Sequence, residues 1–112
     1  FQVLAGSAGF LLPTLVVGGV GGVVALANIA PQQCVDIRRL FGAGELGKAA
    51  SLQRRMVPVN TAITARYGVA GLKAALDMLG YYGGPVRSPL LEITEDERQI
   101  LREILQEGEI LP

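Results

Sequence analysis

The stretch that decides the fold is FQVLAGSAGFLLPTLVVGGVGGVVALANIAPQQCV, residues 1–35, which contains no charged residue. Its length exceeds the roughly 20 residues that a helix needs to cross a bilayer, so a membrane span is one interpretation. The glycine pairs at 18–19 and 21–22 oppose it, because each interior glycine costs a helix about 1 kcal/mol relative to alanine. The pattern instead favours a strand, a helix and a second strand, over residues 1–5, 10–17 and 22–27.

Apart from Gln2, both predicted strands are apolar, without the alternation of a strand that has one face in water. Such strands are typical of parallel sheets covered by helices on both sides. A strand–helix–strand crossover is normally one unit of a larger sheet, because two strands alone leave unpaired backbone groups at both edges. The sequence therefore predicts an α/β unit, and we expect several further strands on its N-terminal side.

The rest of the chain has helical spacing. Pro31 suits the first position of a helix, which Gly42 and Gly44 would end. A second helix is predicted from about residue 45 to Gly68, and its inward stripe includes the polar residues Gln53 and Asn60. The remaining predicted elements are a helix over 69–79, a loop over 81–89, and a last helix that starts at a capping box of Thr94 and Glu97 and stops at Gly108.

Composition excludes several kinds of site. The chain of 112 residues has no histidine, which rules out a Ser-His-Asp triad, a Cys-His dyad and an HExxH zinc site. The single cysteine, Cys34, can form neither an internal disulfide nor a zinc cluster, and on a helix stripe it is interpreted as a small hydrophobe. We expect no metal and no cofactor.

Charge is distributed unevenly behind a formal net charge of zero. Residues 36–87 carry 8 basic and 3 acidic side chains, a difference of +5, whereas residues 88–112 carry 2 and 7, a difference of −5. Blocks of this size are usually solvated helix faces, with binding of an anionic partner as the alternative. The overall balance gives no reason to expect nucleic-acid binding.

Two strings carry a resemblance to a known family. VLAGSAGF at 3–10 and GGVGGVVALAN at 18–28 are similar to the seventh and eighth strand segments of the dihydrodipicolinate synthase and N-acetylneuraminate lyase family. LQRR at 52–55, GLK at 71–73 and GYYGGP at 80–85 resemble its C-terminal helices. The resemblance is closest to eukaryotic 4-hydroxy-2-oxoglutarate aldolase and to fungal 2-keto-3-deoxy sugar acid aldolases.

This resemblance implies an α/β fold, the C-terminal portion of a (β/α)₈ TIM barrel followed by a helical bundle. Residues 1–44 would form the last two βα units of the barrel, and residues 45–112 the C-terminal helical region. It further implies a dimer of dimers in the cytoplasm, or alternatively in the mitochondrial matrix, with no membrane or nucleic-acid partner.

The implied chemistry is that of a Schiff-base aldolase, a lyase in which a strand-borne lysine forms an imine with pyruvate or a keto acid. That lysine and a proton-shuttling tyrosine would lie upstream of Phe1, so we assign no catalytic residue to this chain. Lys48 and Lys73 lie on helices away from a barrel mouth and are poor candidates. We expect cleavage of a 4-hydroxy-2-keto acid to pyruvate and an aldehyde. The alternatives are a dihydrodipicolinate synthase that condenses pyruvate with an aspartate-derived aldehyde, and a non-catalytic member.

Three substrate-binding residues follow from the resemblance: the Gly6 backbone, Ser7, and the main-chain carbonyl of Val23, all at strand ends. The purely structural alternatives are a strand-end turn for Gly6 and a helix N-cap for Ser7. Departures from the family's sequence pattern narrow the range of keto acid substrates. Ala8, Gly9 and Ala25 replace side chains that hold the polyol tail of sialic acid, and Ser7 stands where bacterial synthases usually carry an acidic residue. Shorter keto acids are therefore favoured.

Overall fold

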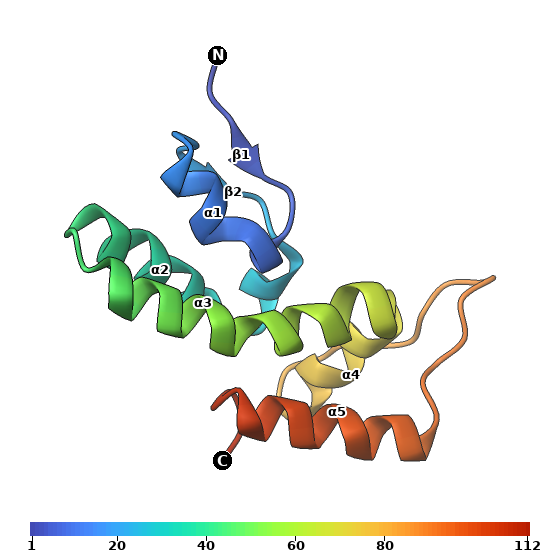
Figure 1. Ribbon diagram of the computed structural model, residues 1–112. Coiled ribbons are helices and arrows are strands. Elements are labelled where there is room, and N and C mark those ends of the chain that lie inside the picture. The colour runs from blue at the N-terminus through green and yellow to red at the C-terminus, as the bar shows by residue number, and fades with distance from the viewer.

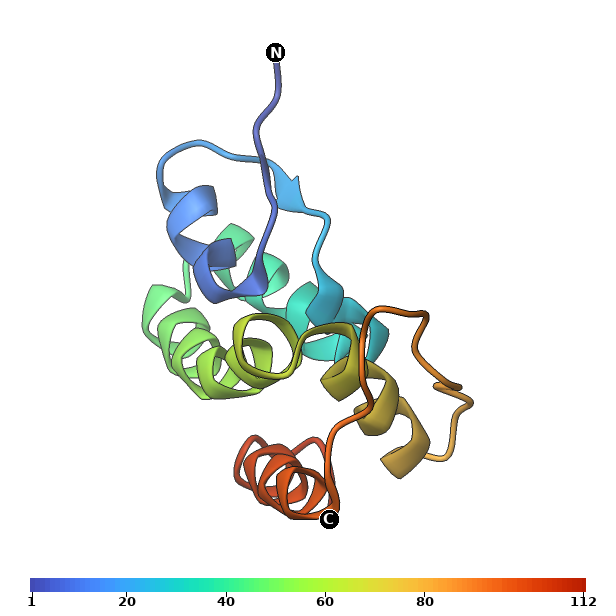
Figure 2. The same cartoon turned by 90° about the vertical axis from the view of Figure 1, so that its right-hand side faces the viewer.

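The computed structural model describes all 112 residues and begins with a parallel strand–helix–strand unit. Strand β1 (Leu4–Ala5) pairs with β2 (Gly21–Gly22), with Leu4 opposite Gly21 and Ala5 opposite Gly22. Two further hydrogen bonds extend this ladder, from Val20 N to Val3 O and from Val23 N to Ala5 O, each 2.9 Å. The strands lie side by side near the N-terminus (Figure 2). The predicted parallel pair is therefore confirmed, with β1 covering only the last two residues of the strand predicted over 1–5.

The second strand is much shorter than the sequence predicts. It ends at Gly22, and residues Ala25–Asn28 form the 3₁₀ helix η2. Leu26, on this helix, has no exposed surface, and its carbonyl accepts hydrogen bonds from the backbone N–H groups of Ile29 and Ala30. Within the run 22–27, only Gly22 belongs to a strand and residues 25–27 belong to η2, so the prediction of a strand there is wrong beyond its first residue.

The connection between the strands is helical, as predicted over 10–17. It consists of the 3₁₀ helix η1 (Ala8–Phe10) and the α-helix α1 (Leu11–Val16). None of the helices in the structure combines the length and the apolar composition needed to cross a membrane. The uncharged stretch 1–35 is instead divided among two strands and four short or partial helices, from β1 to the start of α2.

The longer helices are close to their predicted bounds: α2 (Pro31–Gly42), α3 (Leu46–Thr61), α4 (Gly68–Met78) and α5 (Glu95–Glu107). Helix α3 continues into a π-helix, η3 (Ala62–Arg66), before the turn to α4. Gly44 and Gly68 have φ values of +76° and +57°, which the chain reversals at both ends of α3–η3 require. Helices α2 and α3 lie beneath the strand unit, and α4 and α5 follow below them (Figure 1).

Helix α5 begins at the predicted capping box. Thr94 Oγ1 accepts from Glu97 N at 3.2 Å, and Glu97 Oε2 accepts from Thr94 N at 2.8 Å. Gly108 ends the helix, but the left-handed residue is Glu109, with φ of +59°. Glycine is needed at 108 because an added Cβ would lie 2.4 Å from Val59 Cγ2, so α5 packs too closely on α3 for a side chain there.

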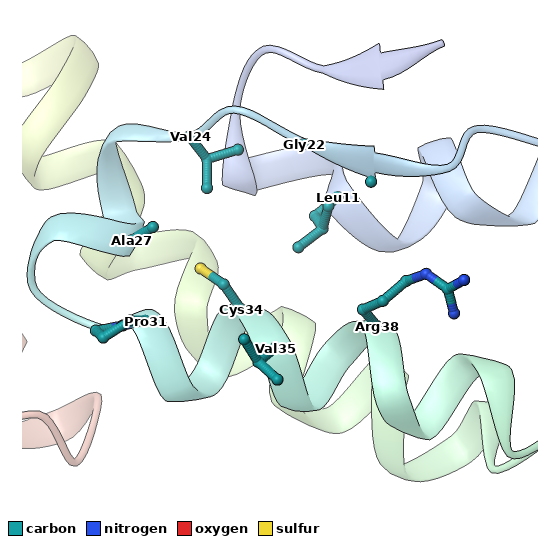
Figure 3. Close-up of a pocket in the computed structure, with 9 residues that line it drawn as sticks. Leu11, Gly22, Val24, Ala27, Pro31, Cys34, Val35 and Arg38 are labelled. Atoms are coloured by element: carbon teal, nitrogen blue, oxygen red, sulfur yellow. The ribbon is translucent and has the colours of Figure 1, made fainter. Parts of the chain in front are cut away.

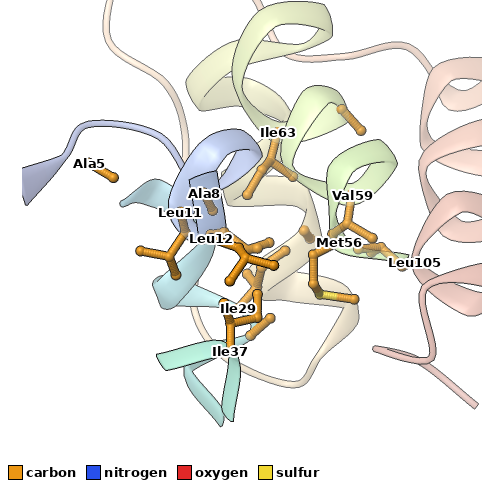
Figure 4. Packing of buried hydrophobic residues seen from close by; sticks show 14 of the residues in the cluster. Ala5, Ala8, Leu11, Leu12, Ile29, Ile37, Met56, Val59, Ile63 and Leu105 are labelled. Carbon is orange, nitrogen blue, oxygen red and sulfur yellow. The ribbon is translucent and has the colours of Figure 1, made fainter. Parts of the chain in front are cut away.

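A single core joins the two halves of the chain. Its 18 buried hydrophobic residues come from β1, η1, α1, η2, α2, α3, η3, α4 and α5, and from Ile29 and Ala30 between η2 and α2. Side chains of α3 and η3, among them Met56, Val59 and Ile63, gather with Ala8 and Leu12 of the strand unit (Figure 4). Helix α3 is therefore the central support of the molecule, in contact with the strand unit on one side and with α5 on the other.

Candidate functional site

The structure places Gly6 and Val23 at the same end of the parallel pair. They directly follow the paired residues Ala5 and Gly22, and the hydrogen bond from Val23 N to Ala5 O closes the ladder at this end. The Val23 side chain is exposed, and an added Cβ on Gly6 would meet no atom within 4 Å. The carboxyl ends of β1 and β2 thus form an open surface, which is where parallel α/β proteins bind ligands.

Ser7 caps the helical turn that follows β1. It has extended backbone, with φ of −146°, and its Oγ accepts a hydrogen bond from Gly9 N at 3.2 Å. This is the N-cap geometry of the structural alternative. The same oxygen also accepts a hydrogen bond of 3.1 Å from Nδ2 of Asn60, which comes from helix α3. Ser7 is therefore fixed both by its own turn and by a residue 53 positions away.

Asn60 reaches Ser7 from within the core. Its side chain is only 5% exposed, and Oδ1, buried with it, has no hydrogen-bond partner. The close approach depends on Gly9, because a Cβ there would lie 3.3 Å from Asn60 Nδ2. A buried amide with one unsatisfied polar atom is unfavourable. The burial of Asn60, with a hydrogen bond from its Nδ2 to Ser7 Oγ, therefore needs an explanation.

Gln53 holds the next part of the same loop. Its Nε2 donates to Ala8 O and its Oε1 accepts from Leu12 N, both at 2.8 Å, and the side chain is buried. Gln53 and Asn60 are seven residues apart, two helical turns, and so share one face of α3. The sequence interpretation placed both on the inward stripe without assigning them a role. Two amides in an otherwise apolar stripe are the signal that could have identified them.

A separate apolar cavity lies beside β2. A cavity of about 320 Å³ opens between β2, α1 and α2, with Leu11, Val24, Cys34 and Arg38 in its wall. The Cys34 side chain points from α2 toward the segment that carries Val24 (Figure 3). Burial raises the pKa of the Cys34 thiol above its ordinary value, which keeps it protonated and supports its interpretation as a small hydrophobe.

Neither lysine singled out in the sequence lies at the strand ends. Lys48 is exposed and pairs at 3.0 Å with Glu45, the residue that precedes α3. Lys73 Nζ donates to Gly83 O at 2.9 Å, which ties α4 to the loop after it. Both lysines lie on helices, Lys48 on α3 and Lys73 on α4, and their ammonium groups already have structural partners away from Gly6 and Val23.

These features define a class: an α/β chain with adjacent parallel strands, an open site at their carboxyl ends, and a helical region packed against them. Residues 1–108 match the model of the dihydrodipicolinate synthetase family. The chain belongs to this family.

Relatives with the name 4-hydroxy-tetrahydrodipicolinate synthase support this membership. The protein of Methanopyrus kandleri is 33% identical over 112 residues, which is 100% of this chain and 37% of the relative. That of Symbiobacterium thermophilum is 36% identical over 111 residues, 99% of this chain and 38% of the relative. The chain thus spans a little over a third of the length of the curated relatives it matches.

Solved structures agree with the fold. Dihydrodipicolinate synthase from Bacillus anthracis superposes with a TM-score of 0.89 at 34% identity, covering 95% of this chain and 36% of that one. The enzyme from Cyanidioschyzon merolae, with lysine bound, gives 0.90 at 28% identity, covering 99% and 38%. The family prediction is confirmed. The narrower likeness to 4-hydroxy-2-oxoglutarate aldolase stays a prediction, since these relatives carry the synthase name.

Proposed function

We propose that the whole protein to which this chain belongs is a Schiff-base lyase acting on pyruvate, and that it condenses pyruvate with an aldehyde. The match of residues 1–108 to the dihydrodipicolinate synthetase family carries this proposal. The synthase name of the relatives favours condensation with an aspartate-derived aldehyde. In this proposal, residues 1–44 are the last two βα units of a TIM barrel and residues 45–112 are its helical extension.

The chemistry would use a lysine amine supplied by the rest of the barrel. The amine attacks the keto carbon of pyruvate and water leaves, which gives a protonated imine. Loss of a proton from the methyl carbon forms an enamine, and this carbon attacks the aldehyde carbonyl. Water then hydrolyses the imine and returns the free amine. The reverse sequence breaks the same C–C bond in a 4-hydroxy-2-keto acid.

This chain would contribute one wall of the pocket. The backbone of Gly6, the hydroxyl of Ser7 and the main-chain carbonyl of Val23 would edge the substrate. Their common position at the carboxyl ends of β1 and β2 supports this assignment. The resemblance adds a dimer of dimers and a cytoplasmic location to the proposal.

Cleavage of a 4-hydroxy-2-keto acid is the second candidate. The observation that favours it is the loop at residues 7–9, where Ser-Ala-Gly offers one neutral hydroxyl and no carboxylate. Both candidates share the pyruvate imine and differ only in the aldehyde. A non-catalytic member of the family would form no imine at all.

Borohydride trapping of the full-length protein tests the proposal. Incubation with pyruvate and borohydride should reduce the imine and attach pyruvate covalently to one lysine, which peptide mass spectrometry would locate outside residues 1–112. Failure to trap pyruvate would overturn the lyase proposal in favour of a non-catalytic role. Rates with the aspartate-derived aldehyde and with 4-hydroxy-2-oxoglutarate would then separate the two candidates.

A further inference from the structure

The Ser7 hydroxyl has its acceptor capacity filled from within the protein. A serine hydroxyl offers two acceptor lone pairs and one O–H donor. Gly9 N donates to Ser7 Oγ at 3.2 Å and Asn60 Nδ2 donates to it at 3.1 Å. Both lone pairs are thereby used, and no acceptor within residues 1–112 takes the hydroxyl hydrogen. Ser7 is left as a hydrogen-bond donor, at the end of the strand where the substrate would bind.

We propose that Asn60 is a positioning residue that holds Ser7 as a donor, and that Ser7 gives its hydrogen to a carboxylate oxygen of the substrate. A carboxylate is the strongest acceptor that a keto acid or its aldehyde partner carries. The inference rests on the proposed function and adds to it the chemical group that this wall recognises. It also predicts that a ligand group able only to donate is disfavoured beside Ser7.

The burial of Asn60 explains why an asparagine suits this position. The side chain is 5% exposed, and Gly9 leaves just enough room for Nδ2 to reach Ser7. Its Oδ1 is buried without a partner, so the side chain is not fully satisfied by the core. Aspartate has nearly the same shape but cannot donate. It would instead accept the Ser7 hydrogen and turn it away from the substrate.

The test uses the full-length protein and the variants Ser7→Ala and Asn60→Asp. Loss of one hydrogen bond to a charged group corresponds to a rise of about tenfold in KM, with kcat changed by less than about twofold. The carboxylate that Ser7 binds belongs either to pyruvate or to the aldehyde partner. A rise in the KM for pyruvate indicates the first, and a rise in the KM for glyoxylate, an aldehyde that carries a carboxylate, indicates the second. Acetaldehyde carries no carboxylate and is the matched control for glyoxylate. Ser7→Thr keeps the hydroxyl and should restore the wild-type KM.

A double-mutant cycle separates positioning from charge or misfolding. If Asn60 acts through Ser7, Asn60→Asp should have little further effect in the Ser7→Ala background. Thr61→Asp is the charge control, because Thr61 is exposed on the same turn of α3. Thermal melting of each variant reports folding. An unchanged KM for pyruvate and for glyoxylate in both variants would overturn the inference, while pyruvate trapping would leave the lyase proposal standing. If borohydride does not trap pyruvate on the wild-type protein, both the lyase proposal and this inference are overturned.

Discussion

Residues 1–44, which comprise the strand unit and helix α2, and the helical region at 45–112 bury their apolar side chains differently. The strand unit leaves Val3, Leu4, Val20 and Val23 exposed. The helical region buries Met56, Val59, Leu101 and Leu105 completely, and its last helix has a full capping box. A helix makes its backbone hydrogen bonds within itself, whereas a strand needs neighbours on both sides. A two-stranded pair therefore depends on other elements in a way that the helices do not.

The two regions are nevertheless joined at the candidate site. Gln53 and Asn60, on α3, hold the loop that carries Ser7 and Ala8. The helical region thus serves as a support for the strand ends. The following predictions, made for the full-length protein, test how strongly one region depends on the other.

The largest effect is expected for Met56→Ala, which opens the shared core. Met56 is completely buried at the centre of α3, and truncation of such a side chain costs about 2–5 kcal/mol of unfolding free energy. Val57→Ala on the next position, 37% exposed, is the matched control and should cost far less. Urea unfolding measures both. Equal costs would show that α3 is not the common support of the two regions.

Gln53→Leu is expected to have the next largest effect, a loss of about 1–3 kcal/mol of unfolding free energy. The substitution keeps the volume but removes both hydrogen bonds to the site loop and leaves the buried Leu12 N–H without its acceptor. Hydrogen exchange should show loss of protection in residues 7–12 before any loss in α5. Gln99→Leu, at an exposed position on α5, serves as the control. Unchanged protection of the loop would contradict the link between the regions.

Thr94→Ala should cost about 1 kcal/mol, because it removes the acceptor for Glu97 N at the start of α5. The effect belongs to the helical region alone, so the KM for pyruvate should stay at the wild-type value. Thr94→Ser retains the cap and should retain the stability measured by urea unfolding. A change in pyruvate KM would mean that α5 is coupled to the strand ends.

The smallest effect concerns the cavity beside β2. Burial raises the pKa of Cys34 in the folded state, so the folded protein holds the thiol proton at pH values where the unfolded chain has lost it. Stability from this source is present below the ordinary thiol pKa and falls as pH rises above it. Cys34→Ala should flatten that alkaline decline in unfolding free energy. An unchanged slope would show that the thiol is solvated.

Local signals predicted the helical elements well. Pro31, the Thr94–Glu97 pair and the glycines at 44 and 68 act within a few residues of themselves, so their effect is readable from the sequence. The 22–27 run was misassigned because a short apolar segment has no period that separates a strand from a buried helical turn. The positions of Gly6, Ser7 and Val23 came from the family resemblance, and their role in binding stays a prediction.

By itself, the sequence determined that this is an α/β chain with an uncharged strand unit, where its long helices begin and end, and which family it resembles. Only the tertiary structure decided that the run after β2 is helical and that Gln53 and Asn60 support the site loop. These contacts join residues 41 to 53 positions apart. No local pattern encodes such a pairing, because it exists only after α3 has packed against the strand ends.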